Sequence, residues 1–113
     1  MRTLNDLRAE HPAAAFEMRP LPQSDGTVYL MTMPLWYWRR LEVVLMTGPK
    51  TLSKITDFCL SLAHRAVEDE GWALENAYRE LLMYYIYRHF QGYINARDNL
   101  SNDNWDNCFL HLP

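Results

Sequence analysis

The chain has 113 residues, of which 49% are hydrophobic and 22% are charged, so one folded domain is expected and an intrinsically disordered chain is excluded. No apolar run approaches the ~18 residues of a membrane-spanning helix, and the first residues hold acids without an apolar stretch, so we expect neither a membrane anchor nor a secretory signal. The net charge is −3, but residues 27–66 carry five basic against two acidic side chains and residues 67–113 carry three against eight. A basic centre beside an acidic C-terminal part is a hint about partners.

The first 26 residues predict a short helix followed by an arm. Thr3 is a suitable N-cap, and Asp6 three residues later completes a loose capping box for a helix over residues 3–11. Pro12 ends that helix. Residues 12–26 are rich in Pro, Ser, Asp and Gly, which is typical of an extended, partly flexible arm that ends in a turn.

Residues 27–33, Thr-Val-Tyr-Leu-Met-Thr-Met, are the only convincing strand. They are rich in β-branched and aromatic types and lie between Gly26 and Pro34. A lone strand leaves the hydrogen-bonding groups of its backbone unpaired, so it must find a partner. We expect that partner to be the same strand of a second chain, which makes the protein a homodimer.

Three helices are predicted after this strand. The first spans Leu35 to Thr47, because Pro34 suits the first turn of a helix and Gly48 with Pro49 ends one. The second follows an N-cap at Thr51, and its apolar residues recur with a period of 3.6 at Ile55, Phe58, Cys59, Leu62, Ala63 and Ala66. Gly71 breaks that pattern.

A third helix is predicted from about Leu74 to Tyr93, and its apolar stripe is too wide to be left in water. We therefore expect it to belong to the folded core. The Asn- and Asp-rich stretch 98–107 is predicted to be a loop, and four apolar residues of the tail are expected to dock back on the body, namely Trp105, Phe109, Leu110 and Leu112.

The expected fold is mostly α-helical, with one N-terminal strand that pairs in a dimer. Residues 1–26 form the arm, residues 27–97 form the domain with its added third helix, and residues 98–113 form the tail. The two cysteines, Cys59 and Cys108, have no metal-site spacing. We expect a cytoplasmic protein without a structural disulfide.

Sequence patterns typical of catalysis are absent. The chain has no nucleophile elbow, phosphate-binding loop, dinucleotide-binding fingerprint or zinc-protease motif. Its four histidines are far apart in sequence, and His64 and His89 are expected to be surface or packing residues. The acidic run 68–70 is typical of a solvated helix end. We expect no catalytic residue, no metal site and no cofactor.

The middle third of the chain has a recognisable order of motifs. A strand leads through Pro34 into a helix that contains Arg40-Leu41-Glu42 and closes with Thr47-Gly48, and a helix that opens Thr51-Leu52-Ser53-Lys54-Ile55 follows. This order resembles the ribbon-helix-helix family of DNA-binding proteins, in which a short strand precedes a helix with Arg-Leu near its middle, a Thr-Gly turn and a Ser- or Thr-capped helix. The resemblance covers residues 27–66.

The resemblance implies a mechanism for reading DNA. Two chains pair their strands into an antiparallel ribbon that enters the major groove, and the outward side chains contact base edges. Because strand side chains alternate, this face consists of Val28, Leu30 and Thr32, with Tyr29, Met31 and Met33 turned inward. The amino end of the second helix binds a phosphate through backbone N–H groups and nearby charge, at Lys50, Thr51 and Lys54.

The ribbon face departs from the family's pattern. Thr32 fits, but neither Val28 nor Leu30 can form a bidentate hydrogen-bond pair with a base. Three hypotheses therefore stay open. The first is a homodimeric DNA-binding regulator. The second is a protein-binding module of similar fold that uses its apolar ribbon face and the aromatic residues Trp36, Tyr37 and Trp38. The third is an enzyme, supported only by isolated histidines and acids.

Overall fold

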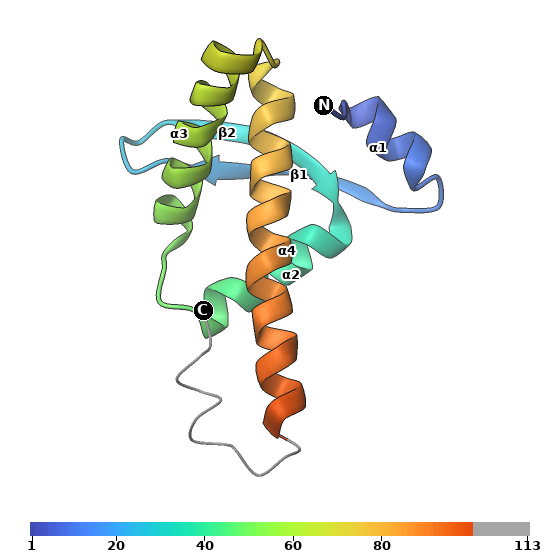
Figure 1. The fold of residues 1–113 in the computed structure, drawn as a ribbon, viewed down its shortest axis with the longest axis vertical. Coiled ribbons are helices and arrows are strands. Elements are labelled where there is room, and N and C mark those ends of the chain that lie inside the picture. Colours follow the sequence, from blue (N-terminus) through green and yellow to red (C-terminus); the bar gives the residue numbers. More distant parts are fainter. Residues whose placement is uncertain (101–113) are drawn as a thin grey trace.

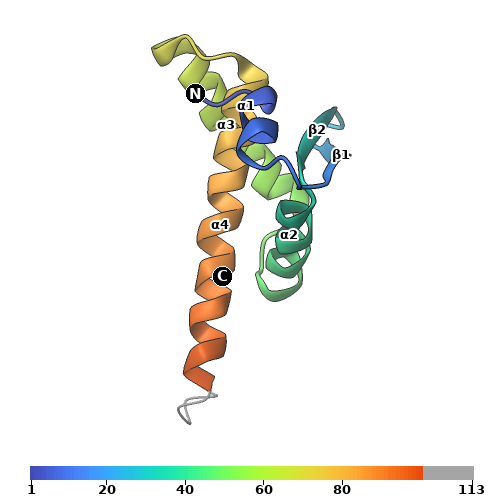
Figure 2. The ribbon, with the colours of Figure 1, turned by 90° about the vertical axis from the view of Figure 1, so that its right-hand side faces the viewer.

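The computed structural model describes residues 1–100 of the chain. This part is mostly helical, with one two-stranded antiparallel sheet. Figure 1 shows the long helix α4 along the longest axis of the molecule, with α3 beside its N-terminal half. In Figure 2, the hairpin and α2 lie on the same side of α4, and the C-terminal part of α4 extends beyond them. The elements are α1 (Leu4–Glu10), β1 (Phe16–Pro22), β2 (Val28–Pro34), α2 (Leu35–Thr47), α3 (Leu52–Glu70) and α4 (Leu74–Leu100).

The predicted strand has a partner within its own chain. Residues 16–22 form β1, which pairs with β2 in a register that runs from Phe16 opposite Pro34 to Pro22 opposite Val28. The prediction of a single strand is therefore wrong, and the segment expected to be an arm supplies half of the sheet. The resulting β1–β2 hairpin needs no second chain to pair its inner backbone edges.

β1 contains Pro20 and Pro22, which argue against a strand when only the sequence is considered. The Gln23 N–H donates to the Thr27 carbonyl (2.8 Å) and the Leu35 N–H donates to the Ala15 carbonyl (2.9 Å), so the odd-numbered residues between them form the hydrogen-bonded pairs. Pro20 and Pro22 are even-numbered. Their missing N–H groups would have pointed away from β2, and the ladder loses no bond.

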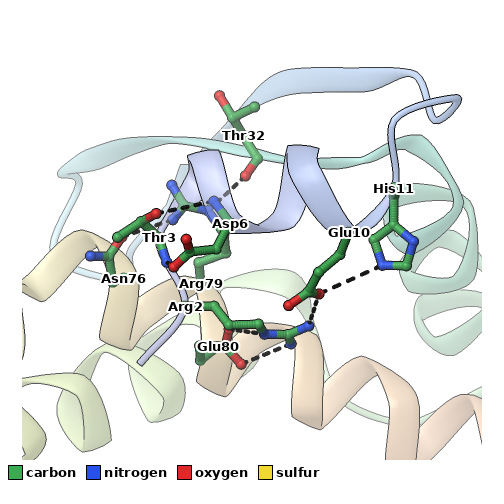
Figure 3. Close-up of polar contacts among 9 residues, drawn as sticks. All are labelled: Arg2, Thr3, Asp6, Glu10, His11, Thr32, Asn76, Arg79 and Glu80. Atoms are coloured by element: carbon green, nitrogen blue, oxygen red, sulfur yellow. Dashed lines mark hydrogen bonds and ion pairs between the residues drawn. The ribbon is translucent and has the colours of Figure 1, made fainter.

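Both outer edges of the hairpin are held by helices. The Pro22 carbonyl accepts a hydrogen bond from Thr56 Oγ1 of α3 (2.7 Å), and the Thr32 carbonyl accepts one from Arg79 Nε of α4 (2.9 Å; Figure 3). Arg79 is completely buried and also donates to Glu75 (2.8 Å). A fully buried guanidinium needs such partners, so the contact fixes β2 against α4.

The core lies between the hairpin and the helices. One face of each element is buried there, and α4 contributes more fully buried side chains than α2 or α3, as the prediction of a core helix requires. α4 is longer than predicted, because residues 94–100 continue the helix where residues 98–107 were expected to form a loop. The fully buried apolar residues include Leu7, Leu21, Met31, Met33, Ile55, Cys59, Tyr78, Leu82 and Ile86.

The predicted helix boundaries are largely confirmed. The capping box of α1 is present, with the Asp6 N–H donating to Thr3 Oγ1 (3.1 Å) and the Thr3 N–H donating to Asp6 Oδ2 (2.9 Å; Figure 3). α2 ends at Thr47 before Gly48. α3 ends at Glu70, and the residue that follows, Gly71, has a left-handed φ of 70°. Thr51 occupies the N-cap of α3, but its side chain makes no capping hydrogen bond.

Within residues 1–100, no helix is long and apolar enough to cross a membrane. Cys59 is buried on the apolar face of α3. The four tail residues that were expected to dock, together with Cys108 and the rest of the predicted loop, lie outside the described residues.

Candidate functional site

The β1–β2 hairpin has two faces that differ in exposure. Met31 and Met33 are completely buried, whereas Val28 is 59% and Leu30 is 57% exposed. Thr32 is half-buried. The predicted alternation of β2 is therefore confirmed, and it turns Val28, Leu30 and Thr32 toward the surface.

β1 doubles this surface. The register places Met18 opposite Thr32, Pro20 opposite Leu30 and Pro22 opposite Val28. All three β1 residues are exposed, and Met18 is 60% exposed. Opposite residues of an antiparallel pair point to the same face. The outer face of the hairpin thus consists of Met18, Pro20, Pro22, Val28, Leu30 and Thr32.

The outer face carries no charge. The opposite face, here called the inner face, consists of the odd-numbered residues of both strands. It includes the two charged residues of the strands, Glu17 and Arg19. There Arg19 Nη1 pairs with Glu42 of α2 at 2.8 Å, and its guanidinium lies 5.4 Å from the centre of the Trp38 ring. Thr32 is the one side chain of the outer face that can form a hydrogen bond.

The turn of the hairpin is fixed to α3. The Gly26 N–H donates to the Gln23 carbonyl (3.1 Å), and Gly26 has a φ of 90°, a backbone conformation that glycine adopts without steric cost. The Ser24 N–H donates to Asp57 Oδ1 of α3 (3.0 Å), and the Ser24 hydroxyl contacts the same carboxylate. The outer face is therefore presented on a rigid element.

The predicted phosphate-binding residues lie elsewhere. Lys50, Thr51 and Lys54 are exposed at the beginning of α3. Lys50 lines a groove with Tyr85 and His89 of α4, whereas the outer face includes no residue of that groove. The structure thus brings Val28, Leu30 and Thr32 together and places the three residues of α3 in a second group.

The described residues do not assemble a reactive centre on this face. Among them, no group of three or more His, Cys, Asp or Glu side chains is placed to hold a metal ion. Burial raises the pKa of Cys59 to about 12, so its thiol stays protonated near neutral pH and is a poor nucleophile. What the outer face offers is apolar contact area.

Sequence reasoning missed the half of the face that β1 supplies. A strand signal was present, because apolar and charged residues alternate over the first part of β1, at Phe16, Glu17, Met18 and Arg19. The remaining residues, Pro20, Leu21 and Pro22, are apolar or proline. The pair Asp25-Gly26 between two such runs is a common hairpin turn. Because proline is rare within strands, Pro20 and Pro22 led to the prediction of an extended arm in place of a strand.

Comparison of the chain with protein-family models, with curated proteins and with solved structures finds no match. No relative therefore assigns a role to any residue of the outer face or of the groove beside α3.

Proposed function

We propose that this protein is a non-catalytic protein-binding module that docks a partner protein on the outer face of its hairpin. The observation that carries the proposal is the exposure of Met18, Val28 and Leu30 side by side on one rigid, uncharged surface. Contiguous exposed apolar side chains on a soluble domain are typical of interaction sites, whereas isolated ones need no explanation.

The alternation of the strands supports this reading. An antiparallel sheet with one wet face normally shows apolar residues inward and polar residues outward. β2 instead reads Val-Tyr-Leu-Met-Thr-Met-Pro, so both of its faces are apolar. This pattern is typical of a sheet that is covered on both sides, and within residues 1–100 only the inner face is covered.

The capped edges favour binding across the face. An extended peptide that adds a strand to a sheet needs free backbone groups along the edge. Here the carbonyls of Pro22 and Thr32 already accept hydrogen bonds from α3 and α4. The partner therefore contacts side chains of the outer face, and its specificity rests on shape.

Site-specific photo-crosslinking in cells that express the chain tests the proposal. A photoreactive amino acid replaces Val28, at the turn end of the face beside Leu30, and in a second variant it replaces Met46, which is 84% exposed on α2. We expect a discrete adduct from position 28 that disappears when Leu30→Asp is added. An adduct of twice the chain mass would identify a second copy of this protein as the partner.

The control position decides the outcome. Met46 is apolar and exposed like Val28, but it lies outside the hairpin. The same adducts from both positions, or none from position 28, would contradict the proposal.

DNA binding is a second candidate. Lys50 and Lys54 are exposed at the start of α3, whose first turn carries no acid, and the positive end of a helix attracts phosphate. The intrachain hairpin is itself a two-stranded ribbon of the kind that the major groove admits. The outer face offers one hydrogen-bonding side chain, Thr32, so base readout is poor. Retardation of duplex DNA at low salt, abolished by Lys50→Ala with Lys54→Ala, would favour this candidate.

A further inference from the structure

A groove between α3 and α4 is separate from the outer face. Its larger compartment has a volume of about 510 Å³ and is bounded by Phe58, Leu62, Tyr84, Tyr85 and Arg88, among others. A smaller compartment of about 240 Å³ adjoins it and shares Lys50, Tyr85 and His89. The larger volume lies within the range of small-molecule sites in proteins.

The walls of the groove are aromatic. Phe58 of α3 and Tyr85 of α4 are in edge-to-face contact along it, with ring centres 6.4 Å apart and planes inclined by 60°. Tyr85 also stacks on His89 at 4.0 Å. Phe58 is 54% and Tyr84 is 58% exposed, so their rings are available to a flat ligand, and aromatic pairs of this kind add to the energy of simple burial.

The rim of the groove is cationic. Lys50 Nζ lies 6.0 Å from the centre of the Phe58 ring, and Arg88 lies over the Tyr84 ring at 5.9 Å. No Asp or Glu lines either compartment. Within the described part of the chain, neither Lys50 nor Arg88 forms an ion pair. Burial, followed by repulsion from Lys50 and Arg88, lowers the pKa of His89, in accord with a positive field in the groove.

We infer that the groove binds a small aromatic carboxylate, with the ring system packed against Phe58 and Tyr85 and the carboxylate at Lys50 and Arg88. The aromatic walls and the unpaired cations each select one part of such a ligand. A cationic ligand meets two like charges, and an aliphatic one forgoes the aromatic contacts. This site is independent of partner docking on the hairpin.

Three probes of the same shape test the charge requirement. Isothermal titration of the full chain compares 2-naphthoate with the uncharged 2-naphthylmethanol and the cationic 2-naphthylmethylamine. We expect saturable binding of 2-naphthoate below about 1 mM, in keeping with the modest affinity of ligands of this size. We expect binding about tenfold weaker for the alcohol and weaker still for the amine.

Matched variants locate the site. Lys50→Ala is expected to weaken the binding of 2-naphthoate about tenfold. Lys54 is an exposed lysine of α3 that lines neither compartment, so Lys54→Ala is expected to leave the affinity for 2-naphthoate unchanged. Leu62→Trp fills the larger compartment and is expected to abolish binding. Equal affinity for 2-naphthoate and the alcohol, equal effects of the two lysine variants, or no binding at all would each overturn the inference.

Discussion

Both faces of the hairpin present large apolar side chains, but the two sets differ in what covers them. On the inner face, Leu21, Met31 and Met33 are completely buried against the helices, whereas on the outer face Met18, Val28 and Leu30 are more than half exposed. Hydropathy alone does not separate the two sets. The difference teaches that an apolar residue in a strand identifies a surface that is to be covered, and that only the tertiary contacts show whether the chain itself covers it.

The largest expected effect separates the two faces by stability. Met33→Ala removes fully buried methylene groups and leaves a cavity, so it is expected to lower the free energy of unfolding by about 2–5 kcal/mol. Leu30→Ala on the outer face is expected to change it by less than about 0.5 kcal/mol. Urea unfolding of the two variants measures both values, and equal losses would remove the distinction between the faces.

Arg79 tests how the inner face is held. Arg79→Met keeps much of the side-chain volume but removes the donor to the Thr32 carbonyl, which then lies at the edge of β2 without its present partner. We expect a loss of about 1–3 kcal/mol. Arg88→Met, at an exposed position of the same helix, is the matched control. A melting temperature that falls equally for both variants would show that the buried contact is not special.

Alkaline pH is expected to lower the free energy of unfolding through two buried groups, Cys59 and Tyr78. Burial raises the pKa of Cys59 from 9.0 to about 12 and that of Tyr78 from 10.0 to about 12. The unfolded chain releases these protons first, so the stability from the neutral buried groups is full below about pH 9 and is lost as pH rises toward 12. Each group contributes a slope of about 1.4 kcal/mol per pH unit within its window.

Urea unfolding between pH 8 and 11 measures that slope. Tyr78→Phe is expected to flatten the profile above pH 10, because the titrating hydroxyl is gone. Stability that does not fall at all in this range would show that these side chains are not shielded from water.

The smallest expected effect concerns α1, which brings Leu7 into the core. Thr3→Ala removes the capping box and is expected to cost about 1 kcal/mol. The loss concerns a seven-residue helix near the N-terminus, so hydrogen exchange of the α1 amides is the suitable measurement. Faster exchange confined to α1 is expected, whereas faster exchange throughout the hairpin would mean that α1 stabilises the inner face as a whole.

Much of the helical part of the fold was predictable from local signals. Pro34, Gly48 with Pro49, and Gly71 mark ends that the structure confirms, because their backbone preferences act locally. The end of α4 was missed, since Asn and Asp are only modestly poorer helix formers than Ala or Leu and a run of them does not have to end a helix.

The candidate site was half predictable. The exposure of Val28 and Leu30 follows from alternation within β2, which is local. The contribution of Met18 depends on a pairing register, and the sequence conceals the parity that makes Pro20 and Pro22 compatible with that register. The contact between Arg79 and Thr32 joins residues 47 positions apart, and no local pattern encodes it.

The central claim is that the outer face is the docking surface for a partner protein. The most direct test is the dissociation constant of the partner captured through position 28, measured with the wild type, Leu30→Asp and Met46→Asp. An apolar anchor at the centre of an interface contributes strongly to affinity, so we predict that Leu30→Asp weakens binding by at least about tenfold, whereas Met46→Asp leaves it unchanged. Equal affinities for all three proteins would contradict the claim.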